Sequence, residues 1–163
     1  MDMVFLRQRQ ISQLENGIAI ARYIVDAAGP EAMRTYRDGG DGWTALEALC
    51  HLRDFEAVFI ARTTVTLEQD NPPLPRPNPD ELAIEKRYNE DDPQSVLDEW
   101  QHLRDEFLAL LKSLGDDEAT WARAGIHPIN GPLPLNQILV MAAWHDTNHF
   151  EQMVRTLREQ RTS

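Results

Sequence analysis

Hydrophobic residues recur at intervals of three and four along four long stretches of this chain, which is the period of amphipathic helices. In the first stretch the repeat is carried by Leu14, Ile18, Ala21, Val25 and Ala28. The other three stretches show the same period, and no convincing strand pattern interrupts them. The predicted helices cover residues 3–28, 44–69, 92–114 and 134–160.

Residues with known capping chemistry mark the ends of these helices. In "TALE", the Thr44 side chain can accept a hydrogen bond from the amide of Glu47, and the Glu47 carboxylate can reach back to Thr44. Asp92-Pro93 offers an N-cap followed by a first-turn proline. Gly29-Pro30 and Gly115 are predicted to end the first and third helices.

The segment between the second and third helices has five prolines in residues 71–79 and is predicted to be a stiff, extended connector. About 22 residues of extended chain can travel the ~39 Å length of a helix of about 26 residues. The two helices can then run parallel in an up-down-down-up bundle, although a loop between antiparallel neighbours fits the same counts. A turn-rich stretch, "HPINGPLP", allows a small hairpin. We therefore expect one all-α four-helix bundle domain spanning residues 1–163.

Composition and charge narrow the class of protein. The single cysteine, Cys50, cannot form an internal disulfide, and no signal-peptide pattern stands near the start. The chain has no run of about 18 apolar residues, which a membrane-spanning helix needs. Its formal charge of -11 disfavours phosphate backbones and anionic lipid surfaces. We expect a cytoplasmic protein that binds neither nucleic acid nor membranes.

Three histidines occupy positions where core residues are expected. His145 and His149 lie one turn apart in the last helix, on the stripe that continues from Ile138 and Ala142, and His51 is flanked by apolar residues in the second helix. If the second and fourth helices are antiparallel, the three rings converge. A lone inward histidine is usually hydrogen-bonded in the core, but three would need three separate buried partners, whereas one cation satisfies all of them. The pattern therefore predicts a metal site.

The stretch "HDTNH" also invites comparison with the H-E-x-x-H helix of zinc proteases. Its acid is Asp146 instead of glutamate, and only fourteen residues follow His149, without the downstream histidine of that motif. A third ligand must therefore come from upstream, which disfavours a protease.

The sequence does not identify a general base among the neighbouring polar residues. Asp54 and Asp146 are interpreted as solvated surface carboxylates, with Asp54 as an alternative partner that holds His51. Gln152, on the side of His149, is expected either to orient water or to pack. The remaining candidates have structural interpretations: Cys50 as a small buried hydrophobe, His102 as a solvated residue, His127 as a surface residue or part of a pocket rim, and Trp43 and Trp144 as pocket walls.

Two motifs carry a resemblance that extends over nearly the whole chain. "WTALEALCHLRDFE" and "AAWHDTNHFEQM", in this order, resemble motifs of the DinB-like superfamily, including its YfiT-type members. The resemblance implies an up-down-down-up bundle, a homodimer, and zinc or nickel held by His51, His145 and His149. It also implies a low-molecular-weight thiol cosubstrate, because characterised relatives include thiol-dependent transferases and isomerases. The "HPINGPLP" loop matches the family only loosely, which leaves the substrate open.

Three imidazole nitrogens leave a divalent ion with open coordination positions, which is typical of catalytic sites. We therefore expect metal-activated attack by thiolate or hydroxide on a small electrophile, as in a thiol transferase or a hydrolase. Two alternatives stay open: a non-catalytic metal-binding or ligand-sensing protein, and a metal-free bundle whose histidines pack.

Overall fold

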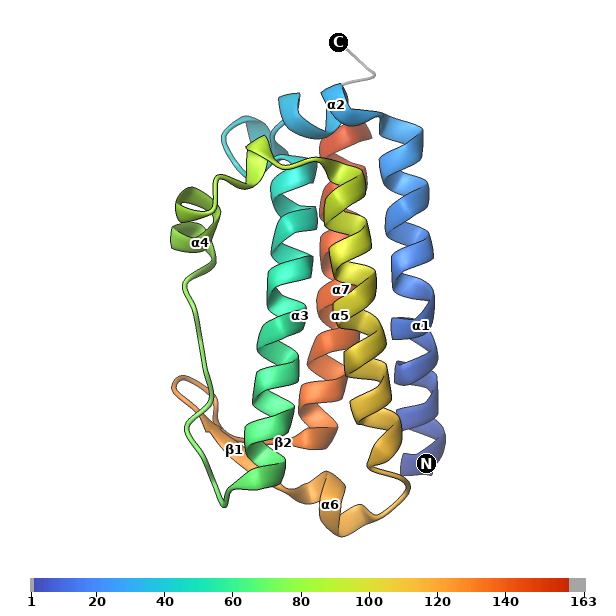
Figure 1. Cartoon of the computed structure of the whole chain (residues 1–163), viewed down its shortest axis with the longest axis vertical. Helices are drawn as coiled ribbons and strands as arrows, with labels where there is room; N and C mark the ends of the chain where they lie inside the picture. The colour runs from blue at the N-terminus through green and yellow to red at the C-terminus, as the bar shows by residue number, and fades with distance from the viewer. Residues whose placement is uncertain (1, 159–163) are drawn as a thin grey trace.

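The computed structural model describes residues 2–158 and shows a bundle of four long helices, which confirms the predicted fold class (Figure 1). The long helices are α1 (Met3–Ala28), α3 (Ala45–Glu68), α5 (Pro93–Ser113) and α7 (Leu135–Arg158). The connections contain the short helices α2 (Pro30–Thr35), η1 (Asp38–Gly40), α4 (Pro79–Glu85), η2 (Tyr88–Glu90) and α6 (Glu118–Ala122), and a hairpin of β1 (Ala124–His127) and β2 (Gly131–Pro134). Among the described residues, no helix has the length and apolar character needed to cross a bilayer.

The observed helix ends follow the capping chemistry of the sequence. The Thr44 hydroxyl accepts from the Glu47 amide at 3.1 Å, and the Glu47 carboxylate accepts from the Thr44 amide at 2.8 Å, so the capping box forms. Asp92 caps α5 through the Ser95 amide. The helix predicted for residues 134–160 begins at Leu135, and its last two positions lie outside the described residues. One expectation was incomplete, because Gly29 ends α1 at a φ of 77° but Pro30 at once starts α2.

Contacts between the long helices give their directions. The ion pairs Arg53–Glu99 and Glu56–Arg104 advance together along α3 and α5, so these two helices run parallel. The His51 ring meets His149 and the Phe59 ring meets His145, so α3 and α7 run antiparallel. The long crossover after α3 returns the chain to the end of the bundle where α3 began, as Figure 1 shows. This order brings the first half of α3 beside the second half of α7.

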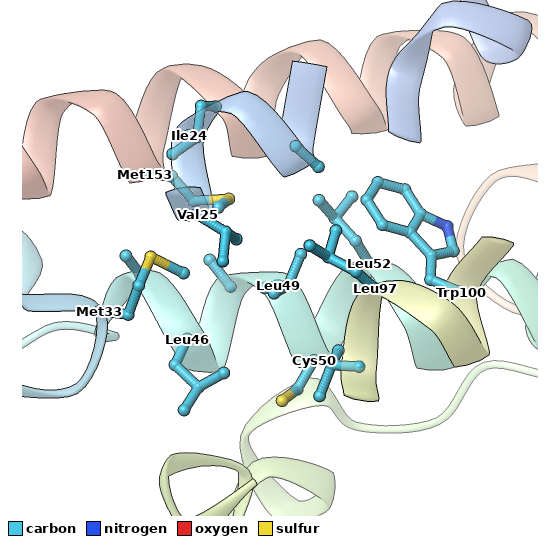
Figure 2. Close-up of a cluster of buried hydrophobic side chains, with 14 of the residues drawn as sticks. Ile24, Val25, Met33, Leu46, Leu49, Cys50, Leu52, Leu97, Trp100 and Met153 are labelled. Carbon is cyan, nitrogen blue, oxygen red and sulfur yellow. The ribbon is translucent and has the colours of Figure 1, made fainter. Parts of the chain in front are cut away.

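Hydrophobic side chains fill the bundle on both sides of the histidines. In Figure 2, Met33 from α2, Leu49 from α3, Leu97 and Trp100 from α5 and Met153 from α7 lie in one buried cluster. Cys50 belongs to this cluster and is fully buried, as expected for a small hydrophobe. A second cluster fills the other end and includes Leu14, Phe107, Leu111, Trp121, Leu133 and Leu139.

A buried arginine in α5 joins all four long helices. Arg104 donates to Glu56 of α3 through Nε and Nη2, both at 2.7 Å, and to Asp146 of α7 through Nη1 at 2.7 Å and Nη2 at 3.1 Å. Nη1 also donates to the Leu14 carbonyl of α1 at 2.8 Å. These bonds account for all five N–H groups of the guanidinium. Burial raises the pKa of Asp146 to about 6, and Arg104 keeps it from rising further, so the carboxylate is ionised near neutral pH.

A second polar cluster fastens the crossover to α3. The Asp54 carboxylate accepts from Tyr88, Lys86 and Arg53, and Arg53 also pairs with Asp91 at 3.0 Å. Burial alone would raise the pKa of Asp54, but the hydrogen bonds from Tyr88 and Lys86 and the charge of Arg53 hold it below its usual value. The ionised carboxylate therefore anchors the segment between α4 and α5.

Asp54→Asn is expected to lower the free energy of unfolding at pH 7 by about 1–3 kcal/mol, because charge-assisted hydrogen bonds are lost. Since the folded pKa of Asp54 lies below its unfolded value of about 3.9, its contribution is complete above that value and is lost as the pH falls through the folded pKa. Urea unfolding between pH 7 and pH 3 should show the variant and the wild type converging at the acid end. The exposed Asp41→Asn is the control, and a gap that stays constant with pH would contradict the assignment.

Gly17→Ala tests how closely α1 approaches the Arg104 network. A Cβ at Gly17 would lie 2.7 Å from Asp146 Oδ2 and 3.1 Å from Arg104 Nη1. We expect a loss of about 1–3 kcal/mol from overpacking, although alanine is the better helix former. Chemical denaturation measures it, with Ala19→Gly at an exposed position of the same helix reporting the propensity difference alone. A gain in stability for Gly17→Ala would show that the network yields easily.

Candidate metal centre

The three histidines predicted to be ligands lie together in the interior of the bundle. His51 comes from α3, and His145 and His149 come from α7. Their possible ligand atoms all lie within 4.8 Å of one another, and the ring centroids are 4.6–4.8 Å apart. Nε2 of His51 lies 2.8 Å from Nε2 of His145, a hydrogen-bond distance. Two ligands of one tetrahedral ion with bonds of about 2.1 Å lie about 3.4 Å apart, so the His51 and His145 nitrogens are already near the spacing that one ion requires.

Local sequence and the Arg104 network together set the direction of these rings. The capping box at Thr44 starts α3 seven residues before His51. On α7, Asp146 turns toward Arg104 between α1 and α5, and one residue along a helix rotates the side chain by about 100°. His145 is thereby directed toward α3, and His149 follows it on the same face one turn later.

Burial keeps all three imidazoles neutral. It lowers the pKa of His51 to about 3, with a further contribution from His149. It lowers the pKa of His145 well below the usual value, helped by the neighbouring His149 and His51. It also lowers the pKa of His149, which Gln152 partly opposes. Neutral imidazole is the form that binds a metal ion, so this donor set fits a divalent transition metal.

A chain of hydrogen bonds behind His149 sets which of its nitrogens is free. Gln152 Nε2 donates to Asp38 Oδ2 at 3.3 Å, so its Oε1 faces His149 Nδ1 at 2.8 Å and must accept a hydrogen bond from the Nδ1–H group. Arg155 holds Asp38 with bonds of 2.6 and 2.9 Å and, more than any other group, keeps the pKa of Asp38 low. His149 therefore carries its proton on Nδ1 and presents the lone pair of Nε2, the arrangement common behind metal-ligating histidines. Gln152 was expected to orient water or to pack, and the contact with His149 is an addition to those two interpretations.

The other side of His51 lacks such support. Its Nδ1 is buried and has no hydrogen-bond partner among residues 2–158. Trp43 and Phe55 flank the ring, at centroid distances of 4.9 and 4.1 Å. The alternative in which Asp54 holds His51 is wrong, because the Asp54 carboxylate is bound to Tyr88, Lys86 and Arg53.

Two further interpretations of the neighbouring acids were wrong. Asp146 is 2% exposed and paired with Arg104, and the Asp54 side chain is 10% exposed, so neither is a solvated surface carboxylate. Each carboxylate pairs with a basic residue that is distant in the sequence, Asp146 with Arg104 and Asp54 with Lys86. Sequence reasoning missed Arg104, although a signal existed: it falls four residues after Trp100 and three before Phe107, on the buried stripe of α5.

A cavity of about 370 Å³ opens beside the histidines. Trp43 and Trp144 line it, as expected, together with Phe55 and Phe59. His127 lines it as well and is 7% exposed, so the surface interpretation was wrong and the pocket-rim alternative fits. His102 is exposed on α5, as expected. The three histidines therefore border a pocket of small-molecule size with aromatic walls.

Comparison with known proteins identifies the family of this chain and a structure with the same fold. The sequence model of the DinB superfamily matches residues 13–153. The chain belongs to the DinB superfamily. No curated protein matches it. Among solved structures, YfiT from Bacillus subtilis is similar, with a TM-score of 0.85 and 24% sequence identity over 94% of this chain and 87% of that one. YfiT is described as "a probable metal-dependent hydrolase with an unusual four-helix bundle topology".

In this DinB superfamily member, Gln152→Leu should allow the His149 ring to carry its proton on either nitrogen, because the Nδ1–H group loses its hydrogen-bond acceptor. Long-range ¹H–¹⁵N spectra of metal-free protein should show the Nδ1–H form in the wild type and a mixture of tautomers in the variant. Affinity for Zn²⁺ should fall about 10- to 100-fold, the usual cost of losing such a partner. Gln137→Leu, at an exposed position of α7, is the control. An unchanged tautomer would refute the assigned role of Gln152.

Proposed function

We propose that this protein is a metal-dependent enzyme in which His51, His145 and His149 hold a divalent transition-metal ion, zinc or nickel, and in which thiolate or hydroxide attacks a small electrophile. The observation that carries the proposal is the convergence of three neutral imidazoles, one buried and two half-buried, whose possible ligand atoms lie within 4.8 Å of one another. The description of YfiT as a probable metal-dependent hydrolase supports the same chemistry.

The composition of the site favours catalysis over a purely structural ion. Structural zinc sites are closed by four protein ligands, whereas the histidine cluster found in residues 2–158 supplies three, beside a cavity. When bound, an ion of this kind lowers the pKa of a water or thiol that joins it and so supplies a nucleophile at neutral pH.

The residues around the cavity have separate contributions. Gln152 orients His149, and Arg104 holds Asp146 and with it the rotation of α7 that points His145 inward. The aromatic walls exclude water from one side of an incoming substrate. None of the described residues that line the cavity is an aspartate or glutamate, so a nucleophile that ionises easily needs the least help from a base. For this reason we place thiolate, from a low-molecular-weight thiol cosubstrate, before hydroxide.

The lack of an aspartate or glutamate among the described lining residues is also compatible with a second function. A cavity without a carboxylate base also suits a metal-binding protein that senses a ligand and catalyses no reaction. The choice between zinc and nickel, the cytoplasmic location and the homodimer remain predictions.

Metal analysis and kinetics of untagged protein test the proposal. We expect about one ion per chain, and its loss in His145→Ala, because two imidazoles hold an ion more weakly than three. Thiol transfer to 1-chloro-2,4-dinitrobenzene, or hydrolysis of a nitrophenyl ester without thiol, should rise in proportion to metal occupancy. His102→Ala, an exposed histidine on α5, should leave both quantities unchanged.

Two results would count against the proposal. If the wild type carries no ion and His145→Ala changes nothing, the histidines serve packing. If the ion is present but every thiol and ester remains unreacted while chelation lowers the melting temperature, the protein is a binding or sensing module.

A further inference from the structure

Arg62 is a buried cation, and no carboxylate of the described residues pairs with it. It lies on α3 three helical turns after His51, hence on the same face, and it is 3% exposed. Its guanidinium carbon lies 5.8 Å from the Phe59 ring centroid, and its Nε donates to the Pro75 carbonyl at 2.9 Å. Within residues 2–158, no carboxylate forms an ion pair with Arg62, and its hydrogen bonds use Nε alone. The four N–H groups on the two Nη atoms are therefore available.

An arginine this deeply buried normally has acidic partners, because desolvating an unpaired charge is costly. Arg104 in the same bundle is 1% exposed and uses all five N–H groups, four of them on two carboxylates. Acids are not scarce, since the chain has 27 aspartates and glutamates against 16 lysines and arginines. The lack of a partner for Arg62 is thus a local feature, and it coincides with the cavity that Arg62 lines.

Two more donors border the same part of the cavity. Arg76 projects from the proline-rich connector, is exposed, and has no ion pair to a carboxylate in the described part of the chain. His127 accepts the amides of Ile129 and Asn130 through Nδ1, at 3.3 and 3.2 Å, so its proton is on Nε2. All three groups line the same cavity, and burial first, then the charges of Arg62 and Arg76, lower the pKa of His127.

We propose that Arg62, together with Arg76, binds the anionic group of a small-molecule substrate, a carboxylate or a phosphate. The planar guanidinium matches either anion with two parallel hydrogen bonds. The cavity of about 370 Å³ continues from Arg62 past Phe59 and Phe55 to the three histidines. The substrate class is accordingly a small acid with an apolar or aromatic body. That its other end reacts at the histidines rests on the proposed function, whereas binding of the anion does not.

The overall charge of the protein sharpens this assignment. With a formal charge of -11, the surface repels anions at long range, so a general affinity for acids is not expected. An anion held here must be recognised by the donors of the cavity. The lining supports this, because its described residues include two arginines and no acid.

Fluorescence and calorimetric titrations with 3-phenylpropionate, phenyl phosphate and inorganic phosphate test the inference, with 3-phenylpropanamide as the neutral match. Trp43 and Trp144 line the cavity and report occupancy. We expect one or both aromatic anions to bind at least about tenfold more tightly than the amide, which is the usual scale for a hydrogen-bonded charge. The carboxylate and phosphate arms show which anion is preferred.

Arg62→Met should lose this preference, Arg62→Lys should retain part of it, and Arg76→Met should weaken binding less. Arg22→Met, on the far helix α1, should have no effect. Because Arg62→Met risks misfolding, the rise in melting temperature that 3-phenylpropionate produces is compared across all four variants. The inference is overturned if the amide binds as well as the acid, or if Arg62→Met keeps full affinity for the acids and for inorganic phosphate.

Binding to the wild type, measured beside its metal content, separates this inference from the proposed function. If the metal proposal fails, the wild type carries no ion but still binds 3-phenylpropionate in preference to the amide. If the anion inference fails, the wild type carries its ion but does not discriminate acid from amide.

Discussion

The structure depends on one buried guanidinium. Arg104 reaches the backbone of α1 and carboxylates of α3 and α7 from its place on α5, so every long helix of the bundle meets at this side chain. A hydrophobic core tolerates many small rotations of a helix, but a fork of five N–H groups accepts few arrangements. The close approach of α1 at Gly17 completes the fit, because a larger residue would press on Asp146 and Arg104. The network therefore fixes the register and rotation of the helices.

The candidate metal centre inherits its geometry from that constraint. Asp146 and His145 are neighbours on α7, so holding one toward Arg104 directs the other toward α3. The same bundle then treats two buried arginines in opposite ways. Arg104 is saturated and structural, whereas Arg62 is left with free donors beside the histidines. A site with neutral imidazoles at one end and a cation at the other has the polarity needed to orient a small acid.

Local features of the chain predicted most of the fold. The capping box at Thr44, the Asp92 cap and the three-to-four repeat of apolar residues act within a few positions, and the observed helices agree with them closely. The spacing of His145 and His149 is local in the same sense. Placing His51 beside them also required that α3 and α7 run antiparallel. The proline-rich crossover is long enough for the bundle order in which they do.

By itself, then, the sequence determined the helices, the bundle class and the inward-facing positions of the three histidines. These follow from periodicity and from polar residues on an apolar stripe. Tertiary structure alone decided the roles of Asp146, Gln152 and Arg62. The partners of Asp146 and Gln152 lie 42 and 114 residues away, and whether a charged side chain is paired depends on which helices pack beside it. Arg62 is distinguished because no acid within residues 2–158 pairs with it, and this depends on which segments assemble around the cavity.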